Sequence, residues 1–421
     1  MTGLRFVHLI GDSPFIDTTM AQFNALTPHN RYLFVTDKTH YTFKYIKSHE
    51  QIELYACDRD ALQRQLTDQA AYDVLVLHSL FTVDITLLRS IPDRISIWWI
   101  SWGYDLYNRH LIDIELFHER TQALRRELGR QGTGKRFFKK DDLRDIISIL
   151  FSRPRPASFL FGKLKERITL WRESPQQAAE RTRSTLEEVI RRVNYCSTII
   201  PDEFDRLSPK GFFTARRLPF NYPFDRDICR AEAIAEDPIA QGSGILIGNS
   251  ASFENNHADL FEILRHIPLP EHDIVVPLNY GDRAYAREIT RIGNECFGKR
   301  FRPLLDFMPF AQYTELLRSC SSAIFYHERQ QAFGSVILTL WNGSKVFMSK
   351  SSILYHYLKK RGIVVFTIPD DLTAGSLATP LAREEVIANR TILSAEYSYA
   401  AIRTKMQTSI ETIGKDRAAV Q

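Results

Sequence analysis

The chain has 421 residues, of which 44% are hydrophobic and 12% aromatic, so it can bury a large core but is too long for one simple domain, and we expect a globular protein of two domains. Its five scattered cysteines form no Cys-x-x-Cys pair, so the sequence suggests neither a disulfide framework nor a zinc site and favours a reducing compartment. No signal-peptide pattern opens the sequence, and no run approaches the roughly 20 apolar residues that span a bilayer, so we expect a cytosolic or peripheral protein.

The net charge of +5 comes from one segment. Between positions 119 and 192 there are 19 Lys and Arg residues against 10 Asp and Glu residues, so the rest of the chain is net negative. Apolar runs such as 146–151 and 159–161 alternate there with basic residues, which is typical of surfaces that lie on anionic membranes. A solvated helical insertion with an ordinary amphipathic face explains the composition equally well. Nucleic acid is not an expected partner, because no recognisable binding module accompanies the charge.

The first half of the chain alternates β-like apolar runs with helical stretches, which predicts a parallel sheet. After the basic segment, two more β-like runs complete this first domain, which we place at 1–225. The predicted strands are 4–10, 31–35, 51–56, 73–78, 95–100, 195–200 and 217–220.

A second set of strands begins after a polar segment. Residues 225–243 are Ala-rich and bounded by Pro238 and Gly242, so we interpret them as a linker helix and hinge. The second set predicts another doubly wound domain, at about 244–380, followed by a helical tail at 381–421. Its predicted strands are 244–248, 274–277, 322–326, 345–348 and 363–368.

Three strands of the second domain end in residues suited to a ligand. Carboxyl ends of parallel strands meet at one edge of a sheet, where a nucleoside diphosphate can bind. The third of these strands, 322–326, is followed by the guanidinium of Arg329 and the amides of Gln330 and Gln331. A helix begins next, and its free N–H groups favour anions. The candidate donor-site residues are Gly248, Asn249, Ser250, Asn255, His257, Tyr280, Arg329, Gln330, Gln331, Gly334 and Ser335.

No motif of the sequence predicts a metal or another cofactor. Residues 129–135 imitate a P-loop, but Arg136 stands where a Ser or Thr would hold Mg²⁺. Asp58-Arg59-Asp60 is similar to an Asp-x-Asp metal motif, yet it directly precedes a helical run, so an N-cap role is favoured.

Three of the five tryptophans fall at 98–102, at the end of a strand and beside Asp105. Aromatic faces suit sugar rings, and an acidic residue at a strand end is a candidate base. The alternative is that the tryptophans belong to the core and Asp105 caps the next helix.

Taken together, these residues resemble glycosyltransferase family 56. The similarity extends in order from about His8 to Gly362, and the basic insertion at about 110–190 is longer than the family pattern. The motifs that carry the resemblance are Trp102-Gly103-x-Asp105-Leu106-Tyr107, Gly248-Asn249-Ser250 with Asn255 and His257, Val275-Val276-Pro277-Leu278-x-Tyr280, Tyr285, Tyr313-x-x-Leu316-Leu317-Arg318-x-Cys320 and Arg329-Gln330-Gln331-x-x-Gly334.

The resemblance implies a GT-B architecture, in which two Rossmann-like domains face a cleft and no metal is required. It implies transfer of a 4-acetamido-4,6-dideoxygalactose-like or fucose-like sugar from a dTDP-sugar to a polyprenyl-diphosphate-linked saccharide, as in enterobacterial common antigen synthesis. It also implies a peripheral position on the cytoplasmic face of the inner membrane.

For the sugar transfer that the resemblance implies, Arg329 and the helix start at Gly334-Ser335 would stabilise the departing diphosphate. Asp105 would deprotonate the acceptor hydroxyl, and the further acceptor-side candidates are His8, Asp12, Trp102 and Tyr107. Two alternatives stay open: a GT-B transferase that uses GDP-fucose or a UDP-sugar, and a non-catalytic protein that binds nucleotide or membrane.

Overall fold

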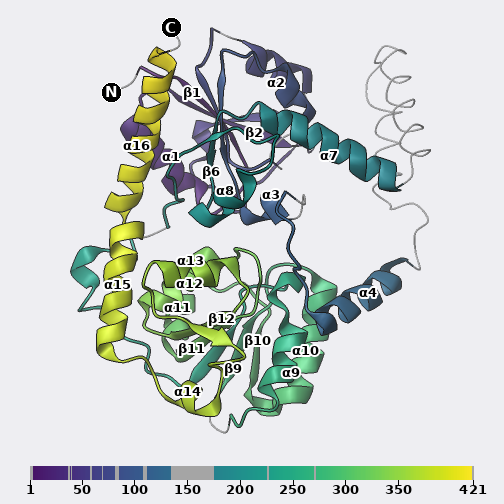
Figure 1. Ribbon diagram of the computed structural model, residues 1–421, viewed down its shortest axis with the longest axis vertical. Coiled ribbons are helices and arrows are strands. Elements are labelled where there is room, and N and C mark those ends of the chain that lie inside the picture. The colour runs from purple at the N-terminus through teal and green to yellow at the C-terminus, as the bar shows by residue number, and fades with distance from the viewer. Residues whose placement is uncertain are drawn as a thin grey trace.

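The computed structural model describes residues 3–36, 38, 40–56, 59–68, 70–80, 85–107, 111–133, 175–224, 227–269 and 272–419. Two parallel sheets, each flanked by helices, form two domains that face each other (Figure 1). The alternation of apolar strands and helices in the sequence therefore produces the predicted α/β fold in both halves.

The first sheet has seven parallel strands in the order β3-β2-β1-β4-β5-β6-β7. Successive residues of a strand point to opposite faces, so Trp98 and Trp99 enter the cores on the two sides of the sheet. Because both faces are covered, the inner strands β4 and β5 are almost continuously apolar rather than alternating, whereas the edge strand β7 consists of the exposed Arg216 and Arg217. The strands are β1 Phe6–Ile10, β2 Asn30–Thr36, β3 Ile52–Ala56, β4 Val74–Leu77, β5 Ser96–Ile100, β6 Tyr195–Ser197 and β7 Arg216–Arg217.

Most helices of the first half cover this sheet, but α4 packs against α9 of the second domain (Figure 1). The basic insertion therefore starts on the second domain and returns to the first through α7. Residues 134–174, its centre, lie outside the described residues. The helices are α1 Ile16–Leu26, α2 Arg59–Thr67, α3 Gly103–Tyr107, α4 Glu119–Thr133, α7 Pro175–Arg191 and α8 Pro201–Leu207, with the 3-10 turns η1 His49–Gln51 and η2 Ile85–Ser90.

The second sheet has six parallel strands in the order β10-β9-β8-β11-β12-β13. Its strand order reverses between β8 and β11, which makes the space above these two strands a topological switch point. The strands are β8 Gly244–Ile247, β9 Ile274–Pro277, β10 Phe301–Leu304, β11 Cys320–Phe325, β12 Lys345–Ser349 and β13 Phe366–Ile368. The helices are α9 His257–Leu264, α10 Arg283–Phe297, α11 Phe310–Arg318, α12 Phe333–Trp341, α13 Ile353–Lys360 and α14 Ala374–Ala378, with the 3-10 turns η4 Phe253–Asn255 and η5 Gly298–Arg300.

The edge strand β10 was not predicted. Its sequence, Phe-Arg-Pro-Leu, contains Pro303, which lacks a backbone N–H and is tolerated only where one side of the strand has no partner. Strand β10 pairs with β9 alone, so the proline fits at this edge.

The predicted linker helix is wrong. Within the described part of 225–243, the only helical turn is η3 Ala231–Ala233. The backbone instead folds around the buried Arg390, whose guanidinium donates to the carbonyl oxygens of Ile234 at 3.1 Å, Asp237 at 2.8 Å and Pro238 at 2.9 Å. These carbonyls are satisfied by a side chain, so the segment needs no helix to be buried.

The C-terminal helices α15 Arg383–Tyr397 and α16 Tyr399–Ala418 run along one side of both domains (Figure 1). Helix α15 packs against α12, whereas Met406, Ile410 and Ile413 of α16 enter a core cluster of the first domain. Within the described residues, no helix is long and apolar enough to cross a membrane.

Candidate functional site

The turn after β8 forms a buried polar recess. Gly248 adopts a φ of +64°, and an ideal Cβ placed there would lie 2.8 Å from His257 Nε2 and 2.9 Å from Asn255 Oδ1. Both of these atoms are buried without a hydrogen-bond partner among the described residues. Burial also lowers the pKa of His257 to about 3, so its ring is neutral. Glycine is required here, because its φ is left-handed and because Asn255 and His257 pack where a Cβ would lie.

The turn after β11 meets this recess. Gln331 Nε2 donates to Asn249 Oδ1 at 3.1 Å, while Gln331 Oε1 is buried without a partner among the described residues. Ser250 is also buried, and its backbone and hydroxyl oxygens accept from Asn255 Nδ2 at 2.9 and 3.3 Å. The structure thus brings the two predicted loops together at the switch point.

Arg329 lies at the domain interface and is 8% exposed. Its Nη1 donates to the Gln330 carbonyl at 3.0 Å, and its Nη2 lies 3.8 Å from Glu254 Oε1. Its Nε is buried without a partner among the described residues. Burial lowers the pKa of Arg329, although nearby carboxylates oppose the shift. A guanidinium that is desolvated but only loosely paired is well suited to an incoming anion.

Helix α12 begins directly after this turn. Ala332 has a φ of +56° and precedes the first helical residue, Phe333. Gly334 and Ser335 lie in the first turn and are partly exposed. The free N–H groups of this turn and the helix dipole favour an anion at the helix start.

The first domain closes over Arg329 through α3. An ideal Cβ at Gly103 would lie 2.5 Å from the Gln330 carbonyl oxygen and 3.3 Å from Arg329 Nη1. Only glycine permits this approach of the two domains. Tyr107 of the same helix is buried and lies close to Glu203 of α8. Neither Tyr107 Oη nor Glu203 Oε1 completes a hydrogen bond within the described residues.

Asp105 does not line an open surface, contrary to the expectation for a base. Its side chain is fully buried, Oδ1 accepts from Ser79 Oγ at 2.7 Å, and Oδ2 accepts from Trp99 Nε1 at 3.2 Å and from the Trp102 N–H at 3.1 Å. Burial raises its pKa, and these hydrogen bonds oppose the rise. The contacts resemble those of a capping residue that holds α3 against β5.

Trp98 and Trp99 are fully buried, so they do not offer a face to a sugar. Trp102 is partly buried, stacks on Tyr222 at 4.8 Å between ring centroids, and donates through Nε1 to the His78 carbonyl at 2.9 Å. Sequence periodicity cannot distinguish an aromatic residue of the core from one that faces a ligand, because both kinds occur near the end of a strand.

Two acceptor-side candidates are held by contacts within the first domain. His8 is fully buried in β1, where its Nδ1 lies 3.1 Å from His78 Nε2, and burial lowers its pKa to about 3. Asp12 accepts from the backbone N–H groups of residues 44, 45 and 46 and from the Tyr41 hydroxyl, so its carboxylate fastens a loop. Tyr280 is 67% exposed at the end of β9, outside the buried recess.

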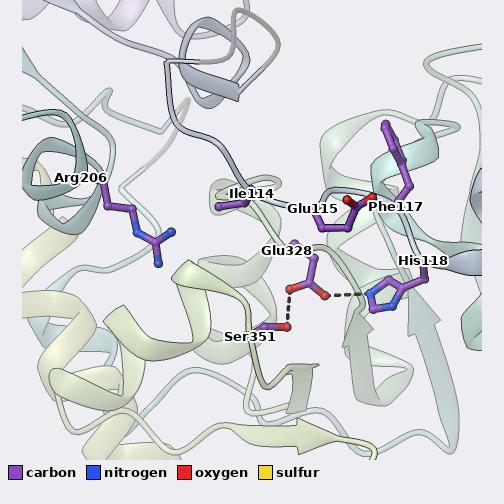
Figure 2. Close-up of a pocket in the computed structure, with 7 residues that line it drawn as sticks. All are labelled: Ile114, Glu115, Phe117, His118, Arg206, Glu328 and Ser351. Carbon is purple, nitrogen blue, oxygen red and sulfur yellow. Dashed lines mark hydrogen bonds and ion pairs between the residues drawn. The ribbon is translucent and has the colours of Figure 1, made fainter. Parts of the chain in front are cut away.

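A pocket of about 360 Å³ lies between residues of the two domains (Figure 2). Glu328 forms part of its wall: Oε1 lies 2.8 Å from His118 Nε2, and Oε2 accepts from Ser351 Oγ at 2.6 Å. Burial raises the pKa of Glu328, but the hydrogen bonds from His118, Ser349 and Ser351 outweigh it, so the pKa is below its ordinary value. The lining residues are Ile114, Glu115, Phe117, His118, Arg206, Glu328 and Ser351.

Sequence reasoning missed the acidic residues of the interface. Glu203 follows the pattern strand-Pro-Asp-Glu, with Pro201 at the first position of α8 and Glu203 at the third, which could have marked a helix start at the carboxyl edge of the first sheet. Nothing in the sequence pairs Glu328 with His118, which is 210 positions away. Among the described residues there is no group of three or more His, Cys, Asp or Glu side chains that could hold a metal ion.

Comparison with known proteins identifies the second domain. A model of the family described as 4-alpha-L-fucosyltransferase, glycosyl transferase group 56, matches residues 217–402. This range contains the whole second sheet and α15, but it is less than half of the chain. The first-domain part of the resemblance, including Trp102-Gly103, lies outside the match.

Solved structures are similar over nearly the whole chain. Sucrose-phosphate synthase of Thermosynechococcus elongatus is 10% identical, with 99% of this chain and 100% of that chain covered and a TM-score of 0.58. HepE of Anabaena, in complex with UDP and glucose, is 12% identical, with 99% of each chain covered and a TM-score of 0.51. The O-GlcNAc transferase of Thermobaculum terrenum is 11% identical, with 100% of this chain and 69% of that chain covered and a TM-score of 0.53.

At these identities the similarity establishes the fold, which is the GT-B architecture, as predicted from the sequence. The match of the second domain to a glycosyltransferase family supplies the activity class. The protein is therefore a glycosyltransferase with a GT-B fold.

Proposed function

We propose that the protein transfers a deoxy-amino sugar or a fucose-like sugar from a dTDP-sugar to a hydroxyl of a polyprenyl-diphosphate-linked saccharide. The observation that carries the donor side of this proposal is the meeting of the β8 and β11 turns at the switch point, through Gln331 and Asn249. The match to a fucosyltransferase family and the sequence motifs named above support the type of sugar.

The proposed donor binds with its diphosphate between the Gly248 turn and the start of α12. Negative charge gathers on the diphosphate as the bond to the sugar breaks. Arg329 and the N–H groups of Gly334 and Ser335 are positioned to stabilise that charge, since the guanidinium is loosely paired and the helix end is partly exposed. Asn255 and His257 support the recess with buried polar atoms that a ligand or a water can satisfy.

The acceptor enters from the side of the first domain. The pocket between α8 and the segment before α4 combines Ile114 and Phe117 with the exposed guanidinium of Arg206, a mixture of apolar and polar surface that suits a saccharide. A polyprenyl-linked acceptor places the protein on the cytoplasmic face of the inner membrane as a peripheral protein. The basic insertion is a candidate for that contact with anionic lipid.

We assign Asp105 a positioning role rather than that of a base, because three donors hold its carboxylate inside the first domain. An Asp105→Asn variant should lower the melting temperature but leave the pH dependence of kcat unchanged. A base would instead contribute about 10²- to 10⁴-fold to kcat and would set its pH profile. A loss of that size together with an altered pH profile would restore Asp105 as the base.

Nucleotide binding tests the donor assignment. The melting temperature should be measured with dTDP, UDP and GDP for the natural protein and for Arg329→Ala, with Arg283→Ala as a control at an exposed position of α10. Free nucleotide at 100 times its Kd stabilises the folded state by about 2.7 kcal/mol.

Selective stabilisation by dTDP that is lost only in Arg329→Ala supports the proposal. Selective stabilisation by UDP, the nucleotide present in the HepE structure, or by GDP would assign another donor. The absence of a shift with all three nucleotides would refute the nucleotide site.

A further inference from the structure

His118 lines the pocket of Figure 2, and the transfer scheme above gives it no role. It directly precedes α4, and its side chain is 30% exposed. Transfer to a hydroxyl still lacks a group that removes the proton, because three donors enclose the carboxylate of Asp105. Histidine is the side chain that most often does this, since the ordinary pKa of imidazole lies near neutral pH.

The imidazole of His118 is held in place by the second domain. Its Nε2 lies 2.8 Å from Glu328 Oε1, the contact drawn as a dashed line in Figure 2. The ring stacks on Tyr326, with the two centroids 4.3 Å apart and 15° between the planes. The backbone N–H of His118 donates to Asn256 Oδ1 at 3.0 Å. A ring fixed in this way needs no rearrangement before it accepts a proton.

Glu328 determines which ring nitrogen carries the hydrogen. Its Oε1 also accepts from Ser349 Oγ at 2.6 Å, and its Oε2 accepts from Ser351 Oγ at 2.6 Å, so three donors converge on one carboxylate. An ionised carboxylate can only accept, so Nε2 of His118 must be the donor. Nδ1 then carries the lone pair of the ring, and it has no hydrogen-bond partner among the described residues.

The contacts of His118 and Glu328 tie both residues to the donor recess. Asn256, which accepts from the His118 N–H, directly follows Asn255 of the recess. Glu328 directly precedes Arg329 in the turn after β11. The same two turns, after β8 and after β11, therefore hold the proposed donor on one side and the imidazole on the other.

We propose that His118 is the general base of the transfer reaction and that Glu328 is the positioning residue that orients it. The inference rests on the proposed function and names the group that receives the proton. Nδ1 takes the proton of the acceptor hydroxyl while that oxygen forms its bond to the anomeric carbon of the donor sugar. The bond from this carbon to the diphosphate oxygen breaks, and its electron pair leaves with the nucleoside diphosphate. The Glu328 carboxylate stabilises the imidazolium, which then releases the proton to water.

This role gives the reaction a pH dependence of definite sign. A protonated imidazole cannot accept a proton, so kcat/KM should fall about tenfold per pH unit on the acid side. Burial raises the pKa of Tyr326 to about 12, so the stacked ring stays neutral there. The other charged groups of the pocket and of the elements packed against it are Glu115 of the same segment, Arg125 of α4, Arg206 of α8 and Asp259 of α9.

Transfer assays between pH 5.5 and 8.5 test the inference, with dTDP-, UDP- and GDP-linked deoxy-sugars as donors and a polyprenyl-diphosphate-linked disaccharide as acceptor. His118→Gln should lower kcat at least 100-fold and abolish the acid limb of the profile. Glu328→Gln leaves the imidazolium without its counter-charge, so it should also lower kcat at least 100-fold. The Kd of the nucleotide should change less than about threefold in both variants, because neither side chain is assigned to the donor.

Two further variants separate chemistry from folding. His118→Ala should regain at least tenfold of its lost rate when imidazole is added, because the added ring can take the proton in its place. His266→Ala is the matched control, since His266 is an exposed histidine of the second domain that also pairs with a glutamate, at 3.2 Å from Glu262 Oε1. It should keep the kcat and the pH profile of the natural protein.

A kcat of His118→Gln within tenfold of the natural value, or an acid limb that persists in this variant, would overturn the inference and leave the proposed function standing. Equal losses of rate and of nucleotide affinity would overturn it as well, because they would show that the pair only holds the donor site. If the variants fail to fold, a natural protein without an acid limb overturns it. The absence of transfer by the natural protein from all three donors would refute the proposed function, and the inference with it.

Discussion

Arg390 fastens the linker between the domains, and its removal is the sharpest stability test. The side chain is 1% exposed, and its Nε donates to the Trp341 carbonyl at 2.6 Å in addition to the three bonds to linker carbonyls. Burial lowers the pKa of Arg390, so a cost of desolvation accompanies these bonds. An Arg390→Met variant would keep the apolar stem and delete all four hydrogen bonds.

The expected loss is about 3 kcal/mol of the free energy of unfolding. Four hydrogen bonds at about 1 kcal/mol net each give about 4 kcal/mol. The variant no longer desolvates a charge on folding, so part of this loss of stability is recovered. For a domain of 150 to 250 residues, such a loss lowers the melting temperature by about 6 to 12 °C. Arg390→Lys keeps the charge but cannot reach several carbonyls at once, so it should lose roughly half as much.

Urea titration and thermal melting measure this effect, and Arg383→Met provides the matched control. Arg383 donates to the Ala235 carbonyl of the same linker at 3.1 Å, but at an exposed position, so its loss should stay within about 0.5 kcal/mol. Arg390→Met with a loss below 1 kcal/mol, or equal losses in the two variants, would refute the view that Arg390 replaces a helix as the support of the linker.

Three substitutions test the geometry of the site and of the insertion. Gly103→Ala places a Cβ 2.5 Å from the Gln330 carbonyl oxygen, so the domains must separate; we expect a larger radius in small-angle scattering and at least a tenfold loss of kcat/KM. Gly248→Ala meets His257 at 2.8 Å with a φ of +64°, so it should raise the nucleotide Kd at least tenfold in calorimetry. Asp259→Ala removes the acceptor of two N–H groups at the start of α4, so hydrogen exchange in α4 should increase while α10 stays protected.

The control for the glycine variants is Gly211→Ala, because an added Cβ meets no atom within 4 Å there. Normal activity in Gly103→Ala would show that the two domains do not need this close approach during turnover. An unchanged nucleotide Kd in Gly248→Ala would place the nucleotide elsewhere, and unchanged exchange in α4 would show that the helix is held by its other contacts.

The sequence predicts the fold well because parallel strands buried on both faces are continuously apolar. It also predicts that the Gly248 and Gln331 turns meet, since the carboxyl ends of parallel strands share one edge. It fails where burial depends on tertiary contacts. Asp105 follows a strand as a catalytic base would, yet its carboxylate turns inward to Trp99.

The linker shows the same limit. Residues 225–243 have a helix-like composition, but Arg390, at least 147 positions later, satisfies the carbonyls that a helix would satisfy. Glu203 was missed because a Pro-Asp-Glu helix start is common in proteins, and because its burial depends on how α8 packs rather than on the local pattern. Local pattern thus determines the elements, whereas the partners of buried charges depend on the assembled fold.

The most direct test of the proposed function is a transfer assay. The protein is incubated with dTDP-, UDP- and GDP-linked deoxy-sugars and a polyprenyl-diphosphate-linked disaccharide, and mass spectrometry follows the acceptor. We predict that the acceptor gains the mass of one sugar residue from the dTDP-linked donor, and that the rate falls at least 100-fold in Arg329→Ala. Nucleotide binding without transfer from any of the three donors would contradict the account and indicate a protein that binds nucleotide without catalysis.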